Sequence, residues 1–300
     1  VSSRPVDGKP RDDMEIWTIE RDADGTWSEP RHVSELSSPT DEWFPTLTAD
    51  GTIYFGSDRP GGVGGTDIWR ARYVNGKFQP PENLGVPVNT KGDEIEPFIA
   101  ADEQVLIISA RNRGDAVGAY DLYVAHRRGG GWDTPKHPGP PINSAGWDFA
   151  PRLSPDGKRV ALDVRDQTED IWIWDLERET LTKLTTSVSS NTWPIWTPDG
   201  THIVFTSARD GRGNNLLRQR ADFTGVAERL TTSVGTQHAT SFSPDGKALV
   251  VQTYGGNFVD LSLMSMETLL SGKPATGTIE PQPLIRTPAG EAGAEISPDG

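Results

Sequence analysis

Apolar and polar residues alternate along residues 158–164, where Val160, Leu162 and Val164 share one face of a predicted strand. A Pro-Asp-Gly turn precedes this segment, and a run rich in isoleucine and tryptophan follows it after a polar loop. A fourth, weaker apolar segment completes the unit. The predicted strands cover residues 150–154, 158–164, 171–176 and 180–186. Four short antiparallel strands in about forty residues are typical of one β-propeller blade.

The turn of this unit recurs along the whole chain, and its aspartates lie roughly 40–55 residues apart. The recurrent turns occupy residues 48–51, 100–103, 154–157, 197–200, 243–246 and 297–300. Asp-Gly pairs tolerate the positive φ of a tight hairpin. A period of this length with four strands per repeat predicts a propeller, because solenoid repeats are shorter or helical.

Two stretches carry a family resemblance. SPDGKRVALDVRDQTEDIWIWDL and TADGTIYFGSDRPGGVGGTDIWRAR resemble the WD40-like repeat of the TolB-type β-propellers, and the resemblance covers nearly the whole chain. It implies the fold. It leaves the function open, because such propellers serve as binding platforms, as gates on enzymes and occasionally as enzymes.

We therefore expect one all-β domain over residues 1–300, a six-bladed propeller of four-stranded antiparallel blades. One blade is expected to be shared between the two ends of the chain, which leaves no long unpaired edge. The predicted blades are residues 1–40 with 291–300, 41–90, 91–145, 146–190, 191–235 and 236–290. The alternative is that the chain is a segment of a longer protein. Residues 264–272 have a short helical or turn pattern.

Composition narrows the function. The net charge of −14 and pI of about 4.8 disfavour nucleic acid and anionic membrane surfaces. No apolar run approaches the length of a transmembrane helix. The absence of cysteine excludes disulfides, thiolate zinc sites and cysteine nucleophiles. We expect the protein to be a monomer. We also expect it to be periplasmic or secreted, mainly because the resemblance to TolB-type propellers implies that location.

The candidate site lies where the first strands of the blades begin, since these ends converge on the central channel of a propeller. The residues there differ from blade to blade, as a site for one asymmetric ligand requires. The candidates are Glu42, Trp43, Glu94, Glu96, Trp147, Asp148, Trp193, Gln237, His238 and Glu291. Carboxylates and indoles suit a basic or amphipathic peptide, or a divalent cation if three carboxylates converge. The competing interpretation is solvated loop charge and core tryptophan.

Arginines recur after the second strands, and an acid or amide precedes the third strands. Pairing across this hairpin predicts a structural, charge-assisted hydrogen bond in every blade. The arginines are Arg4, Arg59, Arg111, Arg165 and Arg209, and their expected partners are Asp67, Asp121, Asp170 and Asn215.

The leading hypothesis is a non-catalytic recognition propeller that binds a protein segment or peptide at the channel mouth, with no cofactor. One alternative is an accessory domain of a serine peptidase or another larger enzyme. Another is a stand-alone lyase or hydrolase, since Gln237-His238 partly matches the metal site of propeller enzymes that cleave uronate oligosaccharides. One imidazole cannot build that site, and no G-x-S-x-G, H-E-x-x-H or phosphate loop is present.

Overall fold

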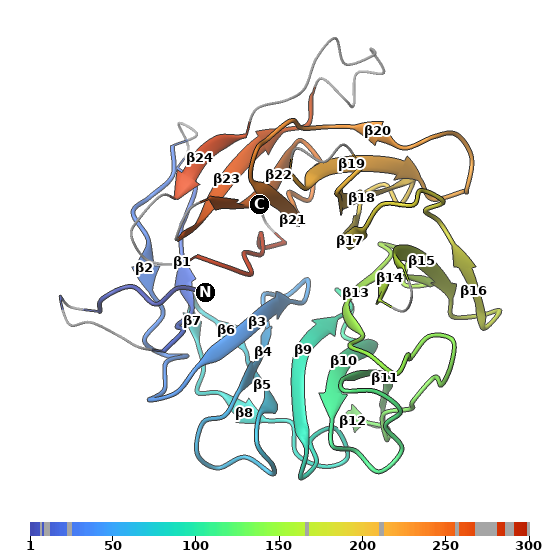
Figure 1. The fold of residues 1–300 in the computed structure, drawn as a ribbon. Coiled ribbons are helices and arrows are strands. Elements are labelled where there is room, and N and C mark those ends of the chain that lie inside the picture. The colour runs from blue at the N-terminus through green and yellow to red at the C-terminus, as the bar shows by residue number, and fades with distance from the viewer. Residues whose placement is uncertain are drawn as a thin grey trace.

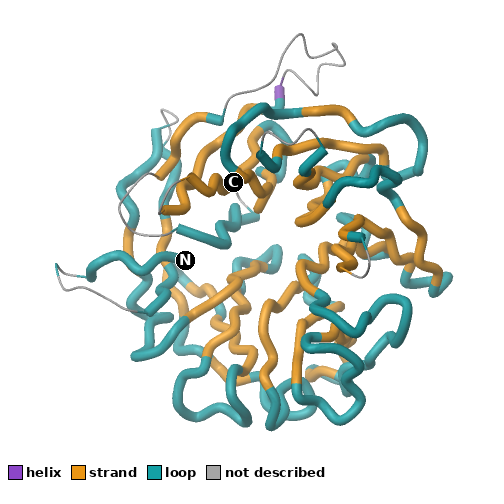
Figure 2. The backbone as a smooth tube through the Cα atoms, viewed as in Figure 1, coloured by secondary structure: helices purple, strands orange, loops and turns teal. Residues whose placement is uncertain are grey.

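The computed structural model shows an all-β ring in which the sheets are arranged radially around a common axis (Figure 1). Strands and the loops between them make up almost all of the backbone (Figure 2). The structure describes residues 1–6, 8, 13–22, 26–165, 168–209, 213–255, 258–267, 281–285 and 291–298.

Five blades are four-stranded antiparallel sheets in which the strand order follows the chain, from the inner strand to the outer one. The first blade contains β3 (Glu42–Leu47), β4 (Ile53–Ser57), β5 (Asp67–Ala71) and β8 (Glu82–Asn83), with the added hairpin β6 (Tyr73–Val74) and β7 (Lys77–Phe78). The second contains β9 (Asp93–Ile99), β10 (Val105–Arg111), β11 (Asp121–Arg128) and β12 (Gly131–Trp132). The third contains β13 (Phe149–Leu153), β14 (Arg159–Arg165), β15 (Glu169–Asp175) and β16 (Thr180–Lys183). The fourth contains β17 (Asn191–Trp196), β18 (His202–Ser207), β19 (Asn215–Arg220) and β20 (Glu228–Arg229). The fifth contains β21 (Thr236–Phe242), β22 (Ala248–Gly255), β23 (Phe258–Ser265) and β24 (Gln282–Ile285).

The remaining part of the ring, the closing sector, is a smaller sheet. It contains β1 (Trp17–Thr18) paired with β2 (Arg31–His32), and single-residue bridges join Ser2 to Glu15 and to Glu291. Four-stranded antiparallel blades are thus confirmed, but the expected count of six is wrong. The described residues form five such sheets, because the pairing through Ser2 is too short to make strands of its neighbours.

The recurrent turns have the conformation that their sequence predicts. Gly51, Gly157, Gly200 and Gly246 have φ between 67° and 81°, a region in which a Cβ atom is strained. The aspartate of each of these turns accepts hydrogen bonds from the hydroxyl two residues before it and the N–H two residues after it. Two expected features lie partly outside the described residues. The last recurrent turn is described only as far as residue 298, and the expected helical segment only as far as residue 267.

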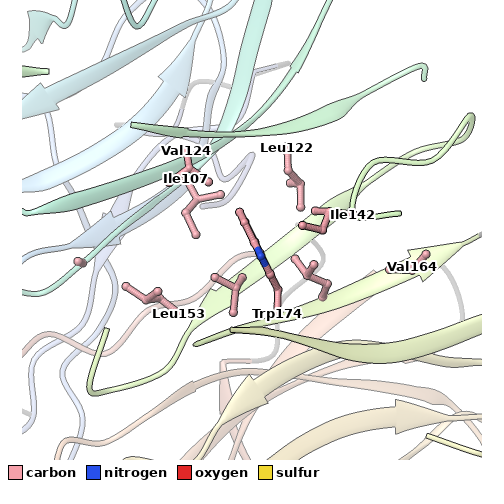
Figure 3. Packing of buried hydrophobic residues seen from close by; sticks show 10 residues of the cluster. Ile107, Leu122, Val124, Ile142, Leu153, Val164 and Trp174 are labelled. Carbon is pink, nitrogen blue, oxygen red and sulfur yellow. The ribbon is translucent and has the colours of Figure 1, made fainter. Parts of the chain in front are cut away.

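The hydrophobic core lies between adjacent blades. Trp174 of β15 packs with Ile107, Leu122 and Val124 of the second blade (Figure 3). Because each blade is covered on both faces, a second strand such as β4 is buried at every position. The alternation expected of half-exposed sheets is therefore lost in these strands.

A hydrogen bond recurs at the boundaries between successive sectors, which we call seams. The N–H of a buried polar residue near the start of an inner strand donates to a backbone carbonyl near the start of the third strand of the previous sector. The donors and acceptors are Glu42 to Met14, Glu94 to Thr66, Asp148 to Tyr120, Gln237 to Asn214 and Glu291 to Val259, at 2.8–3.2 Å. The closing sector therefore forms this bond on both of its sides.

Loop backbones also meet closely at the seams, and Gly64 tests this packing. A Cβ atom there would lie 2.2 Å from the carbonyl oxygen of Thr90 and 2.4 Å from that of Gly92. We expect Gly64→Ala to lower the free energy of unfolding by about 1–3 kcal/mol, as overpacking does. Gly114→Ala is the control, since a methyl group at that position would have no other atom within 4 Å. Equal urea midpoints for the two variants would contradict this packing.

Candidate functional site

All ten predicted site residues lie near one face of the ring. The antiparallel order places the starts of the first and third strands and the ends of the second strands at the same edge of every blade. We call this side the loop face, and the opposite side, which carries the recurrent turns, the turn face.

Six of the ten residues are buried, with exposed fractions of 0–3%. They are Glu42, Glu94, Glu96, Asp148, Gln237 and Glu291. Three of these carboxylates pair with arginines at the same edge of the ring, and the N–O distances are 2.8 Å for Arg59–Glu42, 3.0 Å for Arg113–Glu94 and 3.0 Å for Arg4–Glu291. Such carboxylates hold the ring together. Whether any of them contacts a ligand stays a prediction.

The arginine pairing expected from the sequence is wrong. Asp67 accepts hydrogen bonds from the backbone N–H groups of Val63 and Gly64, and Asp121 accepts them from the equivalent Val117 and Gly118. These aspartates fasten the loop between the second and third strands. Arg4, Arg59 and Arg111 pair instead with Glu291, Glu42 and Asp93, and Arg165 pairs with Asp163 of its own strand at 2.8 Å.

Asp148 accepts hydrogen bonds from the N–H and the hydroxyl of Ser144, at 2.8 and 3.0 Å. Burial nevertheless raises the pKa of Asp148 to about 6. Glu96 lies at a bulge of β9, with φ of 47°, where its Oε2 accepts a bond from the Ser109 hydroxyl at 3.4 Å.

An aromatic cluster, the first cluster, lies at the seam between the second and third blades. Trp147 is 52% exposed, and its ring contacts those of Tyr120 and Phe149 at centroid distances of 5.3 and 5.4 Å. Arg111 lies over the Tyr120 ring at 5.2 Å and pairs with Asp93 at 2.7 Å. Trp147 is thus a large side chain held on a rigid base with much of its surface in solvent.

A second cluster joins the fourth and fifth blades. His238 stacks on Trp193 at 5.0 Å and contacts Tyr254, also at 5.0 Å. The guanidinium of Arg165 lies 5.9 Å from the Trp193 ring. Burial, together with the positive charge of Arg165, lowers the pKa of His238 to about 4, so the imidazole is neutral at pH 7.

Three aromatic residues of this face were not among the predicted site residues. Phe44 directly follows Trp43 in β3, whereas Tyr120 directly precedes β11 and Tyr254 lies near the end of β22. Tyr254 and Phe44 are 40% and 37% exposed. Phe44 and Trp193 have φ near 50° at bulges of β3 and β17, each directly before a proline. An aromatic residue followed by proline in the first strand is the signal that marks such a bulge. Trp43 is half-buried.

The surroundings of His238 do not match a metal centre. Within the part of the chain that the structure describes, no group of three or more histidine, aspartate or glutamate side chains is placed to hold a metal ion. Over the same residues, no helix is long and apolar enough to span a bilayer. A hollow of about 390 Å³ opens on the loop face beside Arg113, lined also by Lys91, Asn112 and Asp115.

The Arg113–Glu94 pair offers a test of the structural role of these carboxylates. Arg113 is 8% exposed, so Arg113→Met leaves a buried charge and should lower the free energy of unfolding by about 3–5 kcal/mol. Arg111→Met removes a pair whose arginine is 46% exposed and should cost less than about 1 kcal/mol. Urea unfolding of both variants measures the difference. Equal losses of unfolding free energy in the two variants would refute the structural role of the buried Arg113–Glu94 pair.

Asp148 should make stability depend on pH. Between about pH 4 and pH 6 the folded protein keeps a proton on Asp148 that the unfolded chain has lost, so this residue costs stability as the pH rises through that window. Asp148→Asn removes the titration. Relative to the wild type, the variant should gain on the order of 2 kcal/mol between about pH 4 and pH 7. Parallel stability curves from urea unfolding would contradict the proton assignment.

Comparison with known proteins agrees with this geometry. The family description "TolB beta propeller domain" matches residues 141–285. The Tol-Pal system protein TolB of Francisella tularensis is 32% identical over 151 residues, which cover 46% of this chain and 34% of that protein. An uncharacterized protein of Agrobacterium fabrum is 35% identical over 108 residues, 36% of each chain. The matches thus span about a third of the length of these relatives.

Among solved structures, a TolB candidate from Agrobacterium tumefaciens is similar over 84% of this chain and 83% of its own, with a TM-score of 0.63. At 24% identity this likeness shows the fold. Together with the match over residues 141–285, it supports a TolB-like β-propeller family for this chain.

Proposed function

We propose that this propeller is a non-catalytic recognition module that binds a protein segment on the loop face. The observation that carries the proposal is Trp147, which is 52% exposed although its ring rests on Tyr120 and Phe149. Large aromatic side chains held on a rigid base are the residues that most often dominate the energy of a protein interface. The second cluster adds Tyr254, which is 40% exposed.

The chemistry of the proposed contact differs from the expected one. A basic peptide would require accessible carboxylates, but those predicted for the mouth are buried, and Glu42, Glu94 and Glu291 already pair with arginines. Around the two aromatic clusters the accessible groups include the rings of Trp147 and Tyr254 together with Arg111, which is 46% exposed. We therefore propose an apolar or aromatic anchor in the bound segment, with Arg111 beside it for a polar or acidic group.

The relatives suggest where such a partner occurs. Those from Francisella tularensis are named Tol-Pal system protein TolB, which motivates the proposal that this protein acts in the bacterial periplasm, with a protein of that system as its partner. The matches span about a third of these relatives, so their partners enter here as proposals.

We also propose that the closing sector completes a six-part ring that is monomeric in solution. The bridges from Ser2 to Glu15 and Glu291 place three chain segments side by side, and the seam hydrogen bonds continue on both sides of this sector. A ring closed in this way leaves only the short outer strands of its blades as edges, and these offer little backbone for pairing with a second copy.

The recognition proposal is tested by replacing one exposed aromatic residue on each face. Trp147→Ala should weaken the affinity for the partner at least about tenfold, as removal of an interface anchor does. Tyr73→Ala is the matched control, because Tyr73 is 46% exposed on the β6–β7 hairpin beside the turn at Gly51, on the turn face. The partner is captured from a periplasmic extract of the source bacterium, purified, and titrated against each variant by calorimetry.

The result expected is loss of affinity in Trp147→Ala alone. Equal affinity of the two variants, with both folded, would remove the loop face as the binding surface.

A further inference from the structure

The seam between the closing sector and the first blade contains two buried carboxyl groups, those of Glu15 and Glu42. Glu15 precedes β1, Glu42 begins β3, and neither residue is exposed to solvent. The N–H of Glu42 donates to the carbonyl of Met14 at 2.8 Å, which brings the Glu42 side chain to the same seam as the neighbouring Glu15. Burial and the nearby Glu15 raise the pKa of Glu42. Two carboxyl groups can share a hydrogen bond only when one of them carries a proton, because an ionised carboxylate has no donor.

The surrounding donors show where the proton resides. Oε1 of Glu42 accepts bonds from Arg59 at 2.8 Å and from the Ser38 hydroxyl at 2.5 Å. Among the described residues, no N–H or hydroxyl group donates to the Oε2 atom of Glu42. This oxygen is therefore the one atom of the group that a proton would satisfy.

Glu15 has its own partners on the side of the closing sector. Its Oε1 accepts a bond from the Ser37 hydroxyl at 2.8 Å, and its Oε2 lies 3.2 Å from Nε2 of His32 on β2. The neighbouring carboxylate of Asp41 accepts the N–H of Met14. The titratable groups at this seam are thus Glu15, His32, Asp41, Glu42 and Arg59.

Charge balance also favours one shared proton. With it, the two glutamates carry a single negative charge, which the buried guanidinium of Arg59 offsets. If the proton were absent, a second negative charge would be buried at the seam, with only the imidazole of His32 near it. Burying such a charge is costly where water is excluded.

The next seam has a similar arrangement but another outcome. Asp67 accepts bonds from two loop N–H groups and from the amide of Asn83, and Glu94 accepts bonds from the N–H and hydroxyl of Thr90 and from Arg113. Burial raises the pKa of Glu94 too. When Glu94 is ionised, however, both of its carboxylate oxygens accept hydrogen bonds. The Glu94 seam is therefore a built-in control.

We propose that the Glu15–Glu42 seam is a proton-dependent latch that fastens the β1–β2 unit to the first blade and loosens as its proton is lost. This latch would act at the boundary between the closing sector and the first blade, independently of any partner bound to the loop face. It assigns to two buried glutamates a role that differs from ligand contact.

The direction of the pH dependence follows from linkage. Burial raises the pKa of Glu42 to about 8 from an ordinary value near 4.5. Between these values, opening of the seam releases a proton. The population of the open seam therefore rises as the pH rises from about 4.5 to 8, by up to about tenfold per pH unit, and is constant above that range.

Hydrogen–deuterium exchange followed by mass spectrometry tests the latch on the full chain. Peptides covering residues 14–18 and 31–36 report on the β1–β2 unit, and rates are corrected for intrinsic exchange with an unstructured reference peptide. From about pH 6 to pH 8 their corrected opening should increase at least about tenfold in the wild type. In Glu42→Gln, whose amide can donate to Glu15 without a titrating proton, the change should be less than about threefold.

Glu94→Gln serves as the control and should keep the wild-type response of these two peptides. Glu15→Gln is the second latch variant and should also abolish the response. It replaces Glu42→Gln in the test if that variant does not fold. The latch is overturned if the wild-type peptides open equally at both pH values, or if Glu94→Gln removes the response as completely as the latch variants do. It is also overturned if the opening is spread uniformly over all five four-stranded blades.

Discussion

The ring depends on how polar groups are satisfied where two blades meet. At five boundaries a buried residue near the start of an inner strand donates its N–H to a carbonyl near the start of the third strand of the previous sector, at 2.8–3.2 Å. The blades otherwise contact one another through apolar side chains such as Trp174 and Ile107, which set no direction along the seam. The backbone bond sets that direction, because buried N–H and C=O groups must be paired and few alternative partners exist.

The side chains of the same residues carry the second part of the constraint. A carboxylate at each of the early seams brings a charge into the interior, and the chain offsets it in different ways: with Arg59, with Arg113, or with donors from Ser144. At the seam between the fourth and fifth blades the same position is occupied by the amide Gln237, where no charge has to be offset, whereas Glu291 at the last seam pairs with Arg4. The seams with a carboxylate are therefore the ones whose strength depends on protonation, and the seam of Glu15 and Glu42 is the extreme case.

Much of this could be predicted from the sequence, since the turns repeat a local signal. Asp156 and Gly157 define a hairpin wherever they recur, so the blade architecture and the position of the inner strands follow from spacing alone. The burial of Glu94 could not be predicted. The sequence around a glutamate at the end of a loop is the same whether its side chain faces solvent or, as here, pairs with a distant arginine such as Arg113. The meeting of the two chain ends was expected from the sequence, but the reduction of that sector to single-residue bridges at Ser2 was not, because the length of a pairing depends on the ring as a whole.

The same limit applies to the candidate site. The aromatic residues Trp147 and Trp193 could be selected by type, but their exposure depends on what the neighbouring blade places against them. Bulges with φ near 50° at Phe44 and Trp193 reorient side chains that strict alternation would assign to the other face. Buried carboxylates thus hold the ring together, whereas exposed aromatic side chains are available to a partner.

The most direct test of that separation is the partner affinity of folded Glu94→Gln, measured by calorimetry. If the carboxylates are structural and the exposed rings bind, the affinity equals that of the wild type although the free energy of unfolding changes. An affinity at least about tenfold weaker, with unchanged stability, would contradict the account and return Glu94 to the binding surface.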